Sequence, residues 1–150
     1  MKFPQGEFRI QLPDGCEHVV PNQFTTIGMQ QILRRAFWGD ALTWYAGLCA
    51  KNPGDVIPLN LINEPAVLNG YDRQTLPLDI NNWPTINQVN GESYVETRDF
   101  TFNLSGATSI QVNRLFLTDG NYVIAISSAF QAGLQFLSTP LTTRYRLYFR

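Results

Sequence analysis

The chain has few charged residues, and no strong excess of either sign. Only 15% of its 150 residues are charged, against the roughly 25% usual in soluble domains, and the net charge is −1. Such a chain has no overall electrostatic attraction for DNA or RNA, so nucleic acid is not expected as a partner. Nine of the eleven basic residues are arginine, which suits planar, partly buried protein contacts better than lysine does.

Cysteine and histidine are also scarce, which excludes several kinds of site. The two cysteines, Cys16 and Cys49, are not a disulfide framework, and with one histidine they match no metal motif. We expect two reduced, small apolar side chains, and leave a bridge between them open. His18 lies among prolines and glycines, so a solvated loop histidine is expected. The chain has no Gly-x-Ser-x-Gly motif, so His18 is not expected to belong to a catalytic triad.

Long apolar runs are missing as well. No stretch approaches the roughly 20 apolar residues that a membrane helix needs. The first residues lack the apolar core of a signal peptide. We therefore expect a soluble protein with no membrane partner and no export signal.

No pattern of catalytic or metal-binding residues stands out. The twelve carboxylates are scattered singly, and nucleotide-binding loops, zinc-protease motifs and calcium loops are absent. Glu92 with Glu96, or Asp72 with Asp79, could be a glycosidase pair on spacing alone, and Asp55 with Asp72 could help to hold calcium. Spacing alone carries almost no weight here, and we expect ordinary loop acids that accept backbone hydrogen bonds. We expect no catalytic residue, no metal and no cofactor.

What the chain does contain is enough apolar surface for one folded domain spanning residues 1–150, since 44% of the residues are hydrophobic and 13% aromatic. Residues 1–24 carry five proline or glycine breakers, so an extended arm with one strand is expected there. Residues 25–38 are predicted to form a helix, capped by Thr25 or Thr26 and ended by Gly39.

The predicted helix has an apolar stripe at helical spacing, which is expected to face the core. Trp38, at the end of the helix, is expected in the core too. The residues of the stripe are Met29, Ile32, Leu33, Ala36 and Phe37.

Residues 41–150 show the pattern of an antiparallel β-sandwich or jelly roll. Together with the strand in the arm, about eight strands are expected, with tight turns at Asn90-Gly91 and Asp119-Gly120. The long segment 51–70 is expected to be a functional or interface loop. The expected strands are 7–12, 41–49, 71–78, 94–104, 112–118, 122–127, 134–137 and 144–149. The expected core includes Trp44, Leu48, Phe100, Phe102, Phe116 and Ile124.

The last strand offers the clearest candidate for an interface. Its residues alternate between an apolar face and a face of arginine and tyrosine, the residue types that anchor protein interfaces. An ordinary solvated strand face is the alternative. With the apolar arm, the predicted interface residues are Phe3, Phe8, Arg9, Arg144, Arg146, Tyr148 and Arg150.

Six short motifs, taken in order, resemble small structural proteins from the virions of tailed bacteriophages. The resemblance spans roughly residues 41–137, most of the chain. The motifs are Trp44-Tyr45-Ala46-Gly47-Leu48, Gly70-Tyr71-Asp72-Arg73-Gln74, Asn82-Trp83-Pro84, Phe100-Thr101-Phe102, Leu115-Phe116-Leu117-Thr118-Asp119 and Ile124-Ala125-Ile126-Ser127.

The resemblance implies a non-enzymatic β-sandwich that assembles on a phage particle. The expected role is a capsid decoration (cement) protein that binds the major capsid protein as a homo-oligomer, with a trimer favoured, in a virion assembled in the host cytoplasm. A tail, adaptor or fibre-base component is one alternative. A carbohydrate-binding jelly roll is another, with Tyr71, Asp72 and an exposed Trp83 as its sugar platform.

Overall fold

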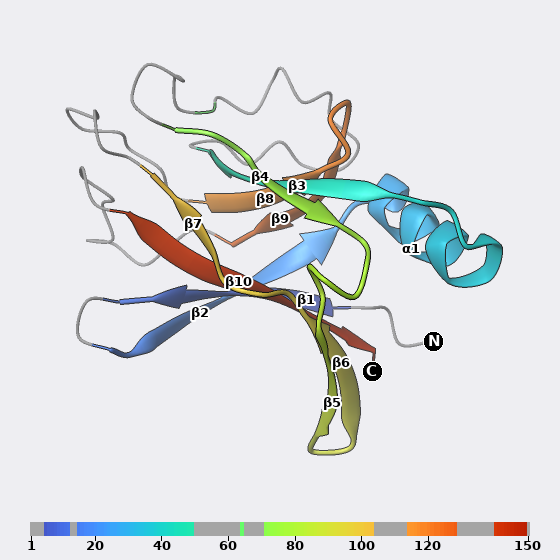
Figure 1. The fold of residues 1–150 in the computed structure, drawn as a ribbon, viewed down its shortest axis with the longest axis horizontal. Helices are drawn as coiled ribbons and strands as arrows, with labels where there is room; N and C mark the ends of the chain where they lie inside the picture. Colours follow the sequence, from blue (N-terminus) through green and yellow to red (C-terminus); the bar gives the residue numbers. More distant parts are fainter. Residues whose placement is uncertain are drawn as a thin grey trace.

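The computed structural model describes residues 5–12, 15–49, 64, 71–103, 114–128 and 140–149. Within them lie ten strands and one helix (Figure 1). In chain order these are β1 (Gln5–Gln11), β2 (Glu17–Phe24), α1 (Thr26–Trp38), β3 (Thr43–Cys49), β4 (Gln74–Pro77), β5 (Thr85–Val89), β6 (Glu92–Glu96), β7 (Phe100–Phe102), β8 (Arg114–Thr118), β9 (Val123–Ser127) and β10 (Leu141–Phe149).

All ten strands belong to one antiparallel sheet in the order β4-β3-β8-β9-β2-β1-β10-β6-β5, with β7 pairing on β10. The sheet curls into a half-barrel, so that β4, β3, β8 and β9 lie over β2, β1 and β10 (Figure 1). Helix α1 lies at one end of the curl. The predicted fold class, mainly antiparallel β with one helix, is confirmed, and a single curled sheet supplies both layers of the sandwich.

The core fills the inside of this curl. All six residues predicted for the core are buried. Five of them belong to the main cluster, which also contains Phe8, Leu76 and Tyr145. Phe116 lies on the other face of β8, in a smaller cluster with Cys49, Val123 and Ile126.

The described part of residues 1–24 forms two paired strands of the sheet, where an extended arm with one strand was predicted. Gln5–Gln11 forms β1, which lies between β2 and β10 in the middle of the sheet. Strand β2 was not predicted, because Pro21 argues against a strand. The carbonyl of Pro21 accepts a 2.9 Å hydrogen bond from the Ser128 N–H, on the side away from β1, and the missing N–H of the proline faces the same way. His18 therefore lies on a strand, half-buried, rather than in a loop.

The predicted strand 94–104 is two strands. Both β6 and β7 pair with β10, at different positions along it. Between them, Thr97 bridges to Tyr145: its N–H donates to the Tyr145 carbonyl at 2.9 Å, and its hydroxyl accepts from the Tyr145 N–H at 2.9 Å. Strand β5 was not predicted, although its turn was. Asn90 and Gly91, with φ of 50° and 79°, join β5 to β6 in a two-residue hairpin.

The predicted helix is correct in extent and wrong in its buried face. Thr25 caps its N-terminus, and Gly39 ends it with a φ of 70°. Its buried residues are Gly28 and Gln31, whereas Leu33, Phe37 and Trp38 are 55%, 80% and 74% exposed. The apolar stripe is therefore largely turned to solvent, and Trp38 is not a core residue.

Close backbone packing explains this orientation. A Cβ on Gly28 would lie 2.2 Å from the carbonyl oxygen of Ile124, so only glycine lets α1 approach β9 so closely. The Thr25 hydroxyl donates to the Val123 carbonyl at 2.7 Å, which fixes the first turn on the same strand. These contacts hold the polar and glycine side of α1 against the sheet.

The predicted strand 134–137 and the predicted loop 51–70, apart from Glu64, lie outside the described residues.

Candidate functional site

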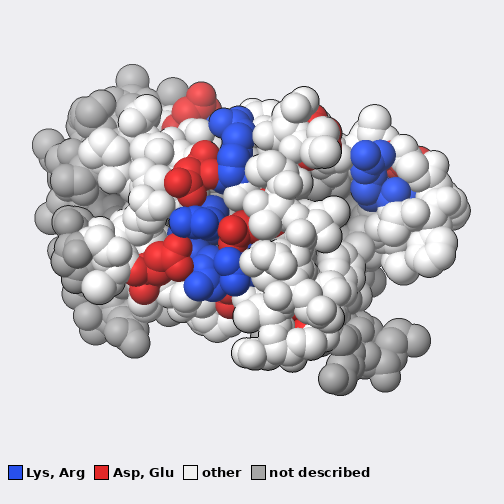
Figure 2. Space-filling model, turned by 60° about the horizontal axis from the view of Figure 1, so that its bottom comes forward, with Lys and Arg blue, Asp and Glu red and all other residues white. Residues whose placement is uncertain are grey.

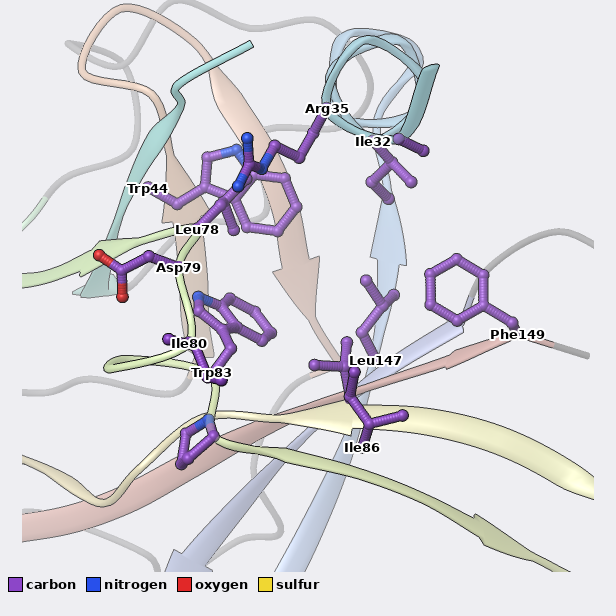
Figure 3. A pocket seen from close by; sticks show the side chains of 13 residues that line it. Ile32, Arg35, Trp44, Leu78, Asp79, Ile80, Trp83, Ile86, Leu147 and Phe149 are labelled. Atoms are coloured by element: carbon purple, nitrogen blue, oxygen red, sulfur yellow. The ribbon is translucent and has the colours of Figure 1, made fainter. Parts of the chain in front are cut away.

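An apolar groove of about 540 Å³ opens between α1 and the β5–β6 hairpin (Figure 3). On one side it is closed by two tryptophans, and on the other by the aromatic ring at the end of β10. Its lining residues are Ile32, Arg35 and Ala36 of α1; Trp44; Leu78, Asp79, Ile80, Trp83 and Pro84; and Ile86, Val95, Leu147 and Phe149. We call this feature the apolar groove.

Strand register builds one wall of the groove. Ile86 pairs with Val95, and Val95 pairs with Leu147, so the three side chains form one cross-strand row over β5, β6 and β10. Residues directly opposite each other in neighbouring strands point to the same face, which is why alternation along each strand gives a continuous apolar row. Ile32 of α1 faces this row across the groove (Figure 3).

The opposite wall consists of aromatic rings that pack edge to face. Trp44 and Trp83 meet edge to face with ring centroids 5.9 Å apart, and Trp83 meets Tyr145 in the same way, also at 5.9 Å. This packing leaves Trp83 only 7% exposed. The wall is thus part of the core, and it is held by the ring contacts rather than by a flexible loop.

The predicted sugar platform is not formed. Tyr71 is buried against Phe102, and its hydroxyl accepts from the Leu48 N–H at 3.0 Å and donates to Glu64 at 2.8 Å. Burial, together with the nearby Glu64 carboxylate, raises the Tyr71 pKa well above its usual range. Trp83 is buried as well, and Asp72 lies exposed beside Tyr71. Tyr71 and Trp83 are thus 3% and 7% exposed, so neither is the exposed ring that the predicted sugar platform requires.

The rim of the groove exposes large apolar side chains. Ile80 and Ile86 are 79% and 82% exposed, and Phe149 is 48% exposed. On α1, Leu33 and Phe37 continue the apolar surface beyond the groove-lining pair Ile32 and Ala36. Single exposed apolar residues are ordinary, but a group of five beside an apolar groove is typical of a docking surface.

The two charged residues of the groove have structural tasks. Arg35 donates to the carbonyls of Gly39 and Asp40 at 3.1 and 3.2 Å, and so caps the C-terminal end of α1. Asp79 accepts hydrogen bonds from the side chain and backbone of Asn82 and from the backbone of Asn81, and these bonds lower its pKa. The groove thus offers shape and apolar contact, and no pair of acid and base converges in it.

The predicted interface strand lies on a different face, which carries a band of alternating charge (Figure 2). Arg146 binds Glu96 at 2.6 Å, and Arg144 binds Glu17 at 3.2 Å. Glu17 also binds Arg9, at 3.0 Å. We call this feature the charged band; its members are Glu7, Arg9, Glu17, Glu96, Asp99, Arg144 and Arg146.

Contacts within the band engage its arginines and the neighbouring tyrosines. The guanidinium of Arg146 lies 4.1 Å from the ring centroid of Tyr94, and the Tyr148 hydroxyl donates to Glu7 at 2.9 Å. Burial lowers the pKa of Arg146, but hydrogen bonds to Glu96 and Tyr148 outweigh it, so the pKa is raised. With four carboxylates to three guanidiniums, the band carries no surplus of positive charge.

The structure therefore brings together Arg9, Arg144, Arg146 and Tyr148 of the predicted interface, on the outer face of the sheet. Their role as contact residues stays a prediction. Phe8 is fully buried on the opposite face of β1, so it is a core residue and not a contact residue. Phe3 and Arg150 lie outside the described residues.

The predicted acid pairs have local explanations. Glu96 forms ion pairs with Arg144 and Arg146, and Asp79 accepts hydrogen bonds within its own turn. Within the described parts of the chain, no group of three His, Cys, Asp or Glu side chains could hold a metal ion. In those parts, too, α1 does not have the length and hydropathy of a membrane-spanning helix.

Sequence reasoning missed the apolar groove, because its walls come from segments far apart in the chain. Two signals pointed towards it. Ile80 stands between Asp79 and Asn81 in a turn, and Ile86 stands among polar residues in a short edge strand. An isoleucine in a polar setting is unusual enough to suggest an exposed contact.

Comparison of the chain with protein-family models, curated proteins and solved structures found no match.

Proposed function

We propose that this protein is a non-catalytic structural protein that works by docking onto other proteins in a larger assembly. The observation that carries the proposal is the apolar groove with its exposed rim. The largest apolar patch on a typical monomer is about 300–600 Å², and patches of this size are often functional. Ile80, Ile86 and Phe149 line the groove, and Leu33 and Phe37 lie on the adjoining side of α1. Their exposed parts together amount to roughly 300–600 Å².

The rest of the surface supports the same proposal. The charges of the charged band pair with one another and leave one surplus negative charge, so the band is suited to an outer face of nearly balanced charge rather than to steering a charged substrate. The sheet is a stiff block with an extensive core. Such a block is suited to positioning contacts in an assembly, where many copies that each bind weakly are together held firmly.

The assembly we propose is the particle of a tailed phage, as the resemblance of the sequence motifs implies. The expected role is capsid decoration, with the major capsid protein as partner. A tail, adaptor or fibre-base position is the alternative within the same particle.

The experiment is co-sedimentation of the purified protein with empty head shells and, separately, with tails of the phage that encodes it. We expect saturable binding to shells at a fixed copy number. Ile86→Gln or Ile80→Gln is expected to weaken it, and the matched exposed valine control, Val19→Gln, is expected to leave it unchanged. Binding to tails alone would select the alternative position, and binding to neither particle overturns the proposal.

A further inference from the structure

We propose that the apolar groove receives the exposed apolar row of α1 from a second copy of this chain. The proposal rests on the docking surface of the proposed function and names what fills it in the free protein: a second copy occupies the groove, and a particle protein would compete with that copy for the same surface. It depends on self-association alone and needs no phage particle.

Helix α1 carries two apolar rows side by side. The inner row, Ile32 and Ala36, lines the chain's own groove. The outer row, Leu33 and Phe37, is displaced from it by one residue, or about 100° around the helix. Residues four apart lie on one face, so Leu33 and Phe37 form a ridge next to the groove.

In the described part of the chain, the outer row is left largely exposed to solvent. Leu33 is 55% exposed and Phe37 is 80% exposed, although they belong to a stripe with the spacing of a buried helix face. The side of α1 that packs on the sheet is instead the side of Gly28 and Gln31. The helix is thus held in a position that presents its apolar ridge outward.

Ridge and groove lie next to each other, which suits a two-fold pair. When a protruding element adjoins a complementary hollow, a two-fold axis between them lets each copy insert its ridge into the groove of the other. The contact then closes on itself, and no open chain of copies grows. This geometry favours a pair of chains over the trimer that the sequence resemblance led us to expect.

The exposed apolar area matches what a stable pair needs. The exposed parts of Leu33, Phe37, Ile80, Ile86 and Phe149 amount to roughly 300–600 Å² of apolar surface. A standard interface buries about 800 Å² on each partner, of which about 450–500 Å² is apolar. The patch therefore supplies most of the apolar part of such an interface on each copy.

Charge does not oppose the pairing. Among the described lining residues, Arg35 is the one cation and Asp79 the one anion, so their charges balance. Ion pairing between Arg34 and Asp40 neutralises the end of the ridge in the same way, at 2.7 Å. Two copies of a neutral apolar patch can approach without like-charge repulsion.

The first test measures the mass of the full chain in solution by sedimentation velocity, over a roughly hundredfold range of concentration. We expect the mass of two chains at the high end. Phe37→Gln, which keeps a good helix former, is expected to raise the dissociation constant by at least about tenfold, as loss of a central aromatic contact does. Val19→Gln is the matched control, because Val19 is exposed on β2 away from the groove.

A cross-linking test identifies the contact itself. In a Cys16→Ser background, chains with Phe37→Cys are mixed with chains with Ile86→Cys under mild oxidation. We expect a disulfide between the two kinds of chain, and none when Val19→Cys replaces Ile86→Cys. Circular dichroism of each variant checks that it is folded.

Two results overturn the inference: the mass of one chain at every concentration, and self-association that Phe37→Gln leaves unchanged. Both are read without shells or tails. A chain that pairs but binds no particle therefore contradicts only the proposed function, and a chain that binds particles as a monomer contradicts only this inference.

Discussion

Trp44 and Trp83 meet edge to face at 78° and share a wall of the apolar groove, but within the described part of the chain only one of them has a hydrogen-bond partner for its indole nitrogen. The Trp44 N–H donates to the Gln31 side chain at 2.8 Å. The buried Trp83 N–H has no hydrogen-bond partner among the described residues. Two rings of the same kind in one cluster therefore differ in a single hydrogen bond.

That difference predicts unequal costs for the same substitution. Trp44→Phe removes the donor and leaves the Gln31 oxygen without it, whereas Trp83→Phe removes a nitrogen that bonds to nothing described. Both lose ring volume. We therefore expect Trp44→Phe to lower the free energy of unfolding by about 1 kcal/mol more than Trp83→Phe does. Urea unfolding of the two variants measures this difference, and equal losses of unfolding free energy would contradict the assigned hydrogen bond.

Gly28→Ala tests the close approach of α1 to β9. Helix propensity alone favours alanine by about 1 kcal/mol. The added Cβ, however, would lie 2.2 Å from the Ile124 carbonyl oxygen, so α1 would have to shift. We expect a net loss of about 1–3 kcal/mol in thermal or urea unfolding.

The matched control for this substitution is Gln30→Ala, on the exposed side of the same helix. It is expected to be neutral or slightly stabilising. If Gly28→Ala behaved like the control, α1 would not be held by that contact.

Glu96→Gln tests the charged band. The Glu96 side chain is only 7% exposed and binds both Arg144 and Arg146. Its neutral isostere leaves a partly buried guanidinium without its carboxylate, so we expect a loss of about 1–3 kcal/mol. Asp40→Asn, which breaks the exposed pair with Arg34, is expected to cost less than about 1 kcal/mol. Comparable losses for the two variants would show that burial does not strengthen the band.

Asp79 predicts a dependence of stability on pH. Hydrogen bonds from Asn82 and Asn81 lower its pKa in the folded state below the ordinary aspartate value of about 3.9. A carboxyl with a lowered pKa stabilises the fold above its unfolded pKa, and this contribution is lost as the pH falls through the folded pKa. The stability advantage of the wild type over Asp79→Asn should therefore be constant at neutral pH and shrink below about pH 4.

Asparagine is the right comparison for Asp79, because it can accept the same backbone hydrogen bonds without titrating. Urea unfolding of both proteins at several pH values gives the difference directly. An advantage that stayed constant into strong acid would mean that the carboxylate charge contributes nothing to this turn.

The features that the sequence predicted correctly depend on neighbours in the chain. Thr25 and Gly39 bound the helix because a capping hydroxyl and a left-handed glycine act over a few residues. Asn90-Gly91 makes its hairpin for the same reason. The predicted core residues are buried because removing large apolar side chains from water is favourable.

The features that the sequence did not predict depend on segments distant in the chain. The buried face of α1 is set by Ile124, Trp44 and Asp119, through a close backbone contact and two hydrogen bonds of Gln31. Periodicity shows that a helix has an apolar stripe, but not whether that stripe meets its own core. The apolar groove could not be predicted for the same reason, since α1 and β5 are brought together only by the curl of the sheet.

The position of β10 between β1 and β6 has a consequence for how the chain folds. Strand β10 joins β1 to β6, so the register of Gln5 with Tyr148 connects opposite ends of the described chain. During synthesis β1 has one neighbour, β2, and an open edge until residue 149 emerges. Pairing between such distant residues slows folding and exposes nascent strands to aggregation, so this sheet is expected to close late, once β10 has left the ribosome.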